Sequence, residues 1–221
     1  MVTFLALAGP FHQLPGQEGA VSFDVGLDHI ILSTGNLAQG TAEFARRTGV
    51  MPVFGGQHPG RGTQNALASL GAGLYLEILA PISGRPDPGS GALTPSGWAI
   101  HTRDLAALIR RVRTAGFSIS DPVPGSRLKP DSTLLRWQTA NLRERLEFAP
   151  FFIEWASGTP HPSSTSPGGC RLTAFTLTAQ DTTWLHGLFE ALGHHGSLRV
   201  GAPGRLSVTL ACPRGTVTFT P

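Results

Sequence analysis

The chain has 221 residues, of which 40% are hydrophobic and 14% are charged. This length and composition allow one large or two small globular domains with a substantial buried core, which excludes a disordered chain. The net charge of +3 comes from sparse charges of both signs, so we expect no nucleic-acid partner. No apolar stretch approaches the roughly 20 residues of a spanning helix, so we expect no integral membrane protein.

Residues 1–25 are predicted to form an N-terminal tail and linker. The apolar start contains Ala6-Leu7-Ala8, which resembles a signal-cleavage motif, but no Lys or Arg precedes it. We prefer a tail or an added edge strand to a signal, a choice that the sequence leaves open, and expect a cytoplasmic protein. Cys170 and Cys212 lie far apart without CxxC spacing and are expected to be small buried hydrophobic side chains in a reducing compartment.

The first structural unit is predicted to begin at Gly26. A strand over 27–33 is followed by a helix that begins at the cap Asn36 and ends at Gly49. Three short strands then lie between glycine-rich segments, over 50–54, 64–70 and 74–79. The order of elements is therefore βαβββ.

This order recurs twice more along the chain. In the second unit, a helix from Asp104 to Gly116 carries apolar residues at helical spacing. Its predicted strands span 98–102, 117–120, 134–139 and 151–155. The third unit has a helix near Asp181 that ends at Gly193. Its predicted strands span 172–178, 198–200, 205–210 and 216–220.

Each βαβββ unit gives a curved sheet with its helix on the convex side, so its concave face has to be covered. We expect an α+β fold in which two units, over residues 26–162, face each other in a cupped, barrel-like mixed sheet with the helices outside. The third unit, over 163–221, is expected either to pack against the first two or to pair with its copy in another subunit. A homodimer is therefore a hypothesis.

Several segments carry a resemblance to a known family. They are LDHIIL at 27–32, HPGRGTQNAL at 58–67, YLEIL at 75–79, PFFIEW at 150–155 and PHP at 160–162. Together they resemble the glyoxalase-like domain branch of the vicinal oxygen chelate superfamily over residues 26–162. The resemblance implies two facing βαβββ units that hold a divalent metal, with ligands from the first and last strands of each unit.

Carried over residue by residue, the resemblance places metal ligands at His29, Glu77 and Glu154. The fourth position falls on Gly97, which has no ligating side chain; His101, on the same face of the strand, replaces it only if the metal lies nearer that end of the cup. Imidazole with carboxylates suits Fe, Mn, Ni or Zn and leaves positions open for a chelating substrate. Glu77 or Glu154 could alternatively be the catalytic base that takes a proton from carbon.

Three further residues are candidates for binding the substrate. His58 and Arg61 lie in a Gly- and Pro-rich loop that could bind a carboxylate or phosphate over the cup mouth, although a turn with a solvated Arg is equally consistent. Arg127 is a candidate of the same kind. The tryptophans on the strands of the second unit are expected to pack in the sheet core rather than to line a pocket. They are Trp98, Trp137 and Trp155.

The leading hypothesis is a metal-dependent enzyme of lyase, isomerase or dioxygenase type that acts on a small substrate with vicinal oxygens. The alternative is a non-catalytic protein of the same fold that binds or sequesters a small molecule, which the missing ligand at Gly97 favours. An interaction module without a pocket is a third possibility. Neither the metal nor the substrate follows from the sequence, because one fold hosts many functions.

Overall fold

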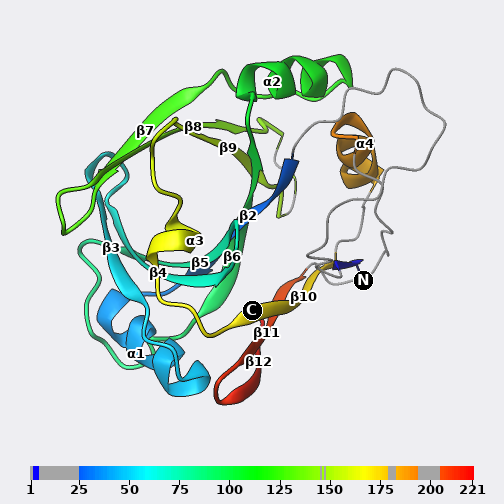
Figure 1. Cartoon of the computed structure of the whole chain (residues 1–221). Helices are drawn as coiled ribbons and strands as arrows, with labels where there is room; N and C mark the ends of the chain where they lie inside the picture. Colours follow the sequence, from blue (N-terminus) through cyan, green and yellow to red (C-terminus); the bar gives the residue numbers. More distant parts are fainter. Residues whose placement is uncertain (1, 5–24, 145, 147, 179–182, 194–204) are drawn as a thin grey trace.

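The computed structural model describes residues 2–4, 25–144, 146, 148–178, 183–193 and 205–221 (Figure 1). The first unit contains β2 (Val25–Ser33), α1 (Leu37–Thr48), β3 (Val53–His58), the 3-10 turn Pro59–Arg61, β4 (Thr63–Gly71) and β5 (Leu74–Pro81). The second contains β6 (Thr94–Thr102), α2 (Leu105–Thr114), β7 (Val123–Leu128), β8 (Leu134–Asn141) and β9 (Phe151–Trp155). The short helix α3 (Pro162–Thr165) follows, and then β10 (Arg171–Thr178), α4 (Thr183–Ala191), β11 (Arg205–Cys212) and β12 (Gly215–Phe219).

The two units share one eight-stranded sheet in the order β3-β4-β5-β2-β6-β9-β8-β7. Each unit pairs its first and last strands in parallel, and the two first strands, β2 and β6, join the units as an antiparallel pair. Figure 1 shows this sheet curled into a nearly closed cup with α1 and α2 on its outside. The predicted α+β fold with a cupped mixed sheet is confirmed.

The cup closes where its two edge strands, β3 and β7, approach each other. A Cβ atom added at Gly56 would lie 2.8 Å from the carbonyl oxygen of Leu128, and Gly56 has a φ of 137°. Only glycine fits this combination of backbone angle and close approach. The glycines of β3 therefore allow the edges to meet.

Local sequence signals set both long helices as predicted. The side chain of Asn36 accepts a hydrogen bond from the backbone N–H of Gln39, and Gly49 ends α1 in the left-handed conformation. Asp104 caps α2 in the same way through Ala107. None of the helices that the structure describes is long and apolar enough to cross a bilayer.

Two strand predictions of the cup are corrected. The second strand of the first unit, β3, begins three residues later than expected, at Val53. The strand expected over 117–120 is wrong: this segment makes only an isolated bridge at Ile119, and the strand lies at β7 instead. The sequence of β7 contains Pro124 and Gly125, which argue against a central strand, but β7 is an edge strand, where proline is tolerated.

The third unit packs against the outside of the cup. Its strands form a second sheet in the order β1-β10-β11-β12, to which β1 (Val2–Phe4) adds an edge strand. Trp98 of β6 contacts Phe175 at 5.4 Å between ring centroids, and Phe44 of α1 stacks on Phe219 at 5.8 Å. One hydrophobic cluster therefore runs through both sheets.

This packing is the first of the two expected arrangements for the third unit. A second subunit is not needed to cover it, so the homodimer loses its main argument and stays a prediction. The expected strand over 198–200 lies outside the described residues.

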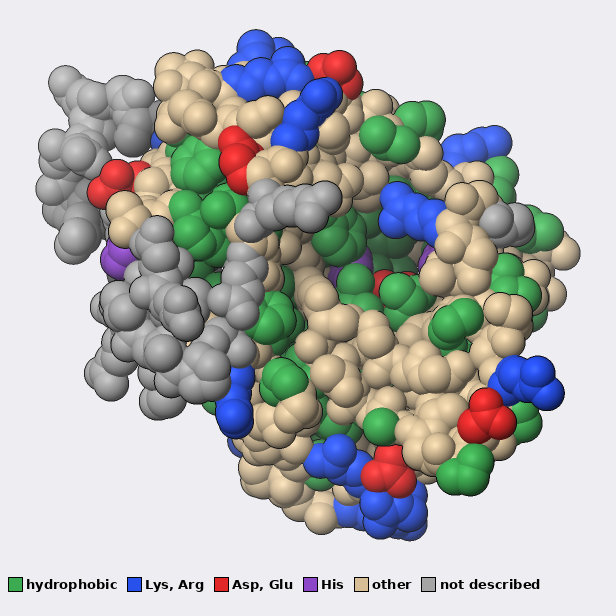
Figure 2. Space-filling model, turned by 180° about the vertical axis from the view of Figure 1, so that it is seen from behind, with side chains coloured by type: hydrophobic (Ala, Val, Ile, Leu, Met, Phe, Trp, Pro, Cys, Tyr) green, Lys and Arg blue, Asp and Glu red, His purple; other side chains and the backbone are tan. Residues whose placement is uncertain are grey.

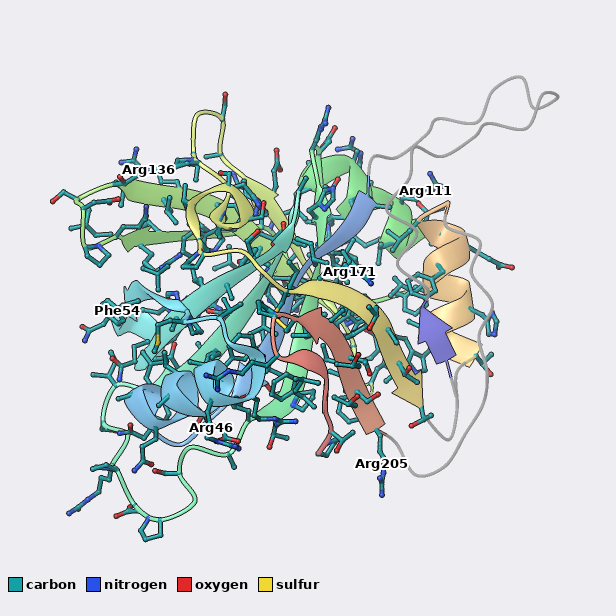
Figure 3. All side chains as sticks on the ribbon, turned by 60° about the horizontal axis from the view of Figure 1, so that its bottom comes forward. Arg46, Phe54, Arg111, Arg136, Arg171 and Arg205 are labelled. Carbon is teal, nitrogen blue, oxygen red and sulfur yellow. A yellow bond between two sulfur atoms is a disulfide. The ribbon has the colours of Figure 1, made fainter. Side chains whose placement is uncertain are left out.

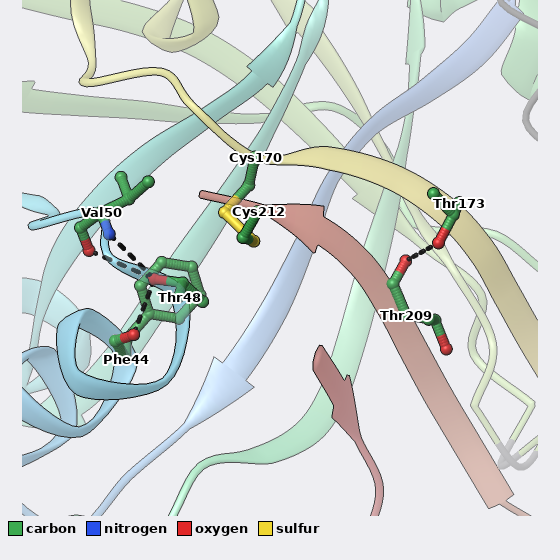
Figure 4. Close-up of a disulfide and its surroundings, with 7 residues drawn as sticks. All are labelled: Phe44, Thr48, Val50, Cys170, Thr173, Thr209 and Cys212. Atoms are coloured by element: carbon green, nitrogen blue, oxygen red, sulfur yellow. Dashed lines mark hydrogen bonds between the residues drawn. A yellow bond between two sulfur atoms is a disulfide. The ribbon is translucent and has the colours of Figure 1, made fainter. Parts of the chain in front are cut away.

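A disulfide joins Cys170 to Cys212 (Figure 4). Cys170 directly precedes β10 and Cys212 ends β11, and these strands pair with Arg171 opposite Ala211, so the two cysteines face each other. The expectation of two separate buried side chains is wrong, because the two cysteines are bonded to each other. They are 42 residues apart in sequence, and only the pairing of β10 with β11 brings them together. Disulfides persist in oxidising compartments, so the cysteines do not support a reducing compartment, and the cytoplasmic location stays a prediction.

Candidate functional site

The interior of the cup is polar on the side of the first unit and mostly apolar on the side of the second. His29 on β2, Asn65 on β4 and Glu77 on β5 are all buried. On β6, Ala99 lies opposite His29 and Gly97 lies opposite Ile31. The second unit therefore places no ligating side chain opposite His29.

A β-bulge brings Asp28 and His29 together. Leu27 pairs with Ile100 and His29 with the preceding Ala99, so Asp28 is an extra residue in β2. Asp28 is fully buried, and its Oδ1 lies 2.6 Å from Nδ1 of His29. Its Oδ2 accepts hydrogen bonds from Trp155 Nε1 at 3.0 Å and from His161 Nε2 at 3.2 Å.

These donors keep Asp28 ionised. Burial alone would raise the pKa of its carboxyl, but the hydrogen bonds from His161 and His29 outweigh it and hold the pKa well below its usual range. An ionised carboxylate only accepts hydrogen bonds, so Nδ1 of His29 carries a proton, and in the neutral ring the lone pair is therefore on Nε2. His29 is thus held as a base or ligand that faces the cup.

Glu77 lies next to this lone pair. Its Oε2 is 3.6 Å from Nε2 of His29, and its Oε1 accepts a hydrogen bond of 2.6 Å from Asn65 Nδ2. Asn65 Oδ1 accepts in turn from Nη1 of Arg127 at 3.2 Å. A chain of polar contacts therefore crosses the cup from β7 through β4 and β5 to β2.

Aromatic rings surround this chain. Tyr75 stacks on His29 with ring centroids 4.6 Å apart, and Phe151 meets His29 edge-on at 5.3 Å. Tyr75 and Trp155 flank His161 at 5.5 and 5.4 Å. Burial raises the pKa of Tyr75 well above its usual range, so its hydroxyl stays protonated and is a potential donor.

The segment between β9 and β10 crosses one open side of the cup and delivers His161. Figure 1 shows α3 in front of the strands of the first unit. Ser69 N–H donates to Pro167 O at 2.8 Å, and Gly73 N–H donates to Ser163 Oγ at 3.1 Å, so the segment is fixed to β4 and to the turn before β5. His161 is the N-cap residue of α3, and its Nε2 contacts the carboxylate of Asp28.

The structure brings together only some of the predicted metal ligands. His29 and Glu77 converge, whereas Glu154 points to the opposite face of β9, where its Oε2 accepts a hydrogen bond of 3.0 Å from Leu105 N at the start of α2. His101 pairs with Gly26, towards the other end of β2, and its ring lies against that glycine. Alternation explains the result, because Phe151, Ile153 and Trp155 occupy the inner face.

The donor set does not fit a resident divalent metal. Such sites usually take three or more protein ligands. Among the described residues, no group of three His, Cys, Asp or Glu side chains is arranged to hold a metal. His29 and Glu77 supply two candidate ligands, and a buried guanidinium, that of Arg127, lies one side chain away from Glu77.

The three predicted substrate-binding residues lie at different depths. His58 ends β3, and its ring meets Trp137 edge-on at 6.4 Å; burial lowers its pKa, which favours the neutral ring. Arg61 is exposed in the 3-10 turn that follows. Arg127 is only 4% exposed and faces the cup. Their roles stay predictions.

Sequence reasoning missed several residues of the network. Trp98 is buried in the core, as expected for the tryptophans. The same expectation is wrong for the other two: Trp155 donates a hydrogen bond to Asp28, and Trp137 packs beside Trp155 at 5.4 Å, so both line the cup. The missed polar residues were within reach of the motifs: Asp28 adjoins His29, and His161 lies in the PHP segment. A second charged residue in an apolar strand was the available signal.

Figure 2 shows a hollow with histidine and acidic side chains at its base and hydrophobic side chains around it. Two grooves open at the surface. One, of about 820 Å³, lies between α1, the 89–94 segment and the C-terminus. The other, of about 540 Å³, lies over β7–β9 and is lined by Arg136 and Glu154 and by the two tryptophans of the cup, Trp137 and Trp155. We assign the site to the cup, because buried ionisable groups with perturbed pKa values cluster at functional sites.

Comparisons with known proteins agree with this architecture. A family model described as a glyoxalase-like domain matches residues 27–193. No curated protein matches the sequence. A hypothetical protein from Staphylococcus aureus is 15% identical, with 89% of this chain and 85% of that chain covered and a TM-score of 0.60, which shows the fold alone.

Two solved structures of methylmalonyl-CoA epimerase are more distant. The enzyme from Mycobacterium tuberculosis is 19% identical, with 59% of this chain and 86% of that chain covered and a TM-score of 0.41. The Streptomyces coelicolor enzyme, in complex with 2-nitronate-propionyl-CoA, is 17% identical, with 60% and 97% covered and a TM-score of 0.42. With identities below 20% and TM-scores of 0.41 and 0.42, these two structures do not indicate the function of this chain.

Proposed function

The chain belongs to the glyoxalase-like domain family, and on that premise we propose that it is an enzyme in which His29 transfers a proton to and from a carbon of a small oxygenated substrate held in the cup. The observation that carries this proposal is the buried pair of Asp28 and His29. Asp28 fixes the tautomer of the imidazole and leaves Nε2 free, which is the arrangement of a general base.

The surrounding residues support the same chemistry. When Nε2 takes a proton from a carbon next to a carbonyl group, the C–H bond breaks and its electron pair moves into an enolate. The imidazolium that forms lies between two carboxylates, those of Asp28 and Glu77, which stabilise its charge. The protonated hydroxyl of Tyr75, whose ring stacks on His29, is suited to stabilise the enolate oxygen. Return of the proton gives isomerisation, and loss of a leaving group gives a lyase reaction.

The predicted metal-dependent form would rest on two ligands, His29 and Glu77. A second candidate, a non-catalytic small-molecule binding protein, is favoured by the apolar inner face of the second unit, where Gly97, Ala99 and Phe151 lie. Measurements of proton exchange and of metal content on the same preparation distinguish the proton-transfer enzyme, the metal-dependent enzyme and the binding protein.

The test is solvent exchange in deuterated water, followed by NMR, on small 2-oxo acids and hydroxyketones. We expect incorporation of deuterium next to the carbonyl and a loss of at least about 100-fold in His29→Gln. Glu154→Gln is the matched control, because Glu154 lies on the outer face, and its exchange rate is expected to stay unchanged.

Unchanged exchange in His29→Gln would refute the assigned base. Stoichiometric metal that is lost in His29→Ala would favour the metal-dependent form. Tight ligand binding without any exchange would favour the binding protein.

A further inference from the structure

Arg127 is a buried cation with few partners. Its stem lies against Gly56 of β3 and its Nη1 against Gly55, and added Cβ atoms there would crowd it. Nη1 donates to Asn65 Oδ1, and among the described residues no carboxylate forms an ion pair with the guanidinium. A guanidinium has five N–H donors, and one neutral acceptor does not compensate for its loss of water. The other donors of Arg127 bind no acceptor among the described residues and are not fully buried, so they are open to an acceptor from outside the chain.

Half-buried aromatic rings border the space in front of this cation. Trp137 lies on β8 opposite Gly125 of β7, the strand that carries Arg127. Its indole rests on the backbone of Gly125, where a side chain would collide with it. Trp155 packs beside Trp137 at 5.4 Å, and His58 meets Trp137 edge-on. These rings are partly exposed, whereas His29 and Tyr75 behind them are buried. Trp137 and Trp155 also line the groove of about 540 Å³ over β7–β9, so their exposed faces are open to a ligand.

We propose that the cup takes substrates that combine a planar aromatic ring with a carboxylate, and that Arg127 binds the carboxylate. The planar fork of a guanidinium matches a carboxylate through two parallel hydrogen bonds, which would use the donors left open. Flat indole rings bind an aromatic ring by stacking, with a contribution beyond the buried area. This inference rests on the proposed function, because it names the substrate class of the same site.

The order of the polar chain adds a constraint on the substrate. Arg127 contacts Asn65, Asn65 contacts Glu77, and Glu77 adjoins His29. A carboxylate on Arg127 is therefore separated from the base by the width of two side chains. The acidic group would orient the substrate, and a different carbon would react.

The experiment measures binding of benzoate to the full-length protein by titration calorimetry. Benzamide has the same shape without the charge, and cyclohexanecarboxylate has the charge without the aromatic ring. We expect benzoate to bind at least about tenfold more tightly than either, since both recognition elements contribute. Equal affinities for benzoate and benzamide, or no benzoate binding at millimolar concentration, would overturn the proposal.

Variants locate the binding site. Arg127→Met is expected to weaken benzoate binding at least about tenfold and to leave benzamide binding unchanged. Arg205→Met is the matched control: Arg205 is exposed on β11 of the second sheet, and Figure 3 shows it at the outside of the molecule. Unaltered benzoate affinity in a folded Arg127→Met protein would contradict the proposal. If that variant does not fold, the three-ligand comparison on the unchanged protein decides.

His29→Gln separates this inference from the proposed function. The variant is expected to retain benzoate binding while it loses proton exchange. Exchange that survives in His29→Gln would refute the base without affecting the ligand class, and loss of the benzoate preference would refute the ligand class without affecting the base.

Discussion

Replacement of Asp28 by Asn tests the most buried charge of the site. The substitution keeps the shape of the side chain and one acceptor oxygen, but it puts an NH2 group in the place of the second oxygen. Asp28 accepts hydrogen bonds from three side-chain donors, which are His29, Trp155 and His161. At least one of these donors loses its acceptor, and the others lose a charged one.

The size of the effect follows from these contacts. A hydrogen bond to a charged group contributes about 1.5–3 kcal/mol, and a buried donor left without a partner costs about 1–3 kcal/mol. We therefore expect Asp28→Asn to lower the free energy of unfolding by about 2–4 kcal/mol at pH 7. Urea denaturation followed by tryptophan fluorescence measures it.

The pH dependence supplies a second check. The pKa of Asp28 in the folded protein lies below the value of about 3.9 of an unperturbed aspartate. Its ionisation therefore contributes stability that is fully present above about pH 5 and is lost as the pH falls from the unfolded pKa towards the folded one. The difference between the unchanged protein and Asp28→Asn should be constant from pH 5 to 7 and should shrink below pH 4.

The control is Asp121→Asn. Asp121 is exposed and pairs with one arginine, Arg113, so its loss should leave the free energy of unfolding almost unchanged. A difference under about 0.5 kcal/mol for Asp28→Asn at pH 7, or one that grows on acidification, would refute the reasoning.

Three further predictions concern the closure and packing of the cup. Gly55→Ala should destabilise the protein by about 1–3 kcal/mol and weaken ligand binding, because the new Cβ would collide with Arg127 and Asn65. Gly60→Ala adds a Cβ in open space, so it should change neither stability nor binding in the same denaturation and binding assays. Phe175→Ala should cost about 3–5 kcal/mol in urea denaturation, because Phe175 is buried between the two sheets; a cost near zero would show that the third unit does not pack there. Cys170→Ser should lower stability by about 2–5 kcal/mol under non-reducing conditions and match the unchanged protein in reductant; equal stability in both conditions would argue against the disulfide.

The order of the elements could be predicted from the sequence because its signals are local. Asn36 and Gly49 bound α1, and Asp104 begins α2, through contacts with residues at most four positions away. The repetition of one βαβββ order implied a shared cup. His29 and Glu77 were also found, because both lie within short motifs of the first unit.

The faces of the strands, by contrast, were decided by the tertiary structure. The cup is apolar outside, where helices and the third unit pack, and its second half is also mostly apolar inside. The apolar residues of β9 therefore lie on both faces of the strand, and alternation does not reveal which face Glu154 occupies. Glu154 therefore turned out to cap α2 rather than to face His29.

Long-range pairing settled the rest of the site. The bulge that turns Asp28 beside His29 exists only in the register of β2 against β6, and the contact of Arg127 with Asn65 spans 62 residues across the closed edge of the cup. The sequence by itself determined which elements form, because helix caps and apolar spacing act over a few residues. Only the tertiary structure decided which side chains meet, because strand register and the closure of a sheet depend on the packing of the whole chain.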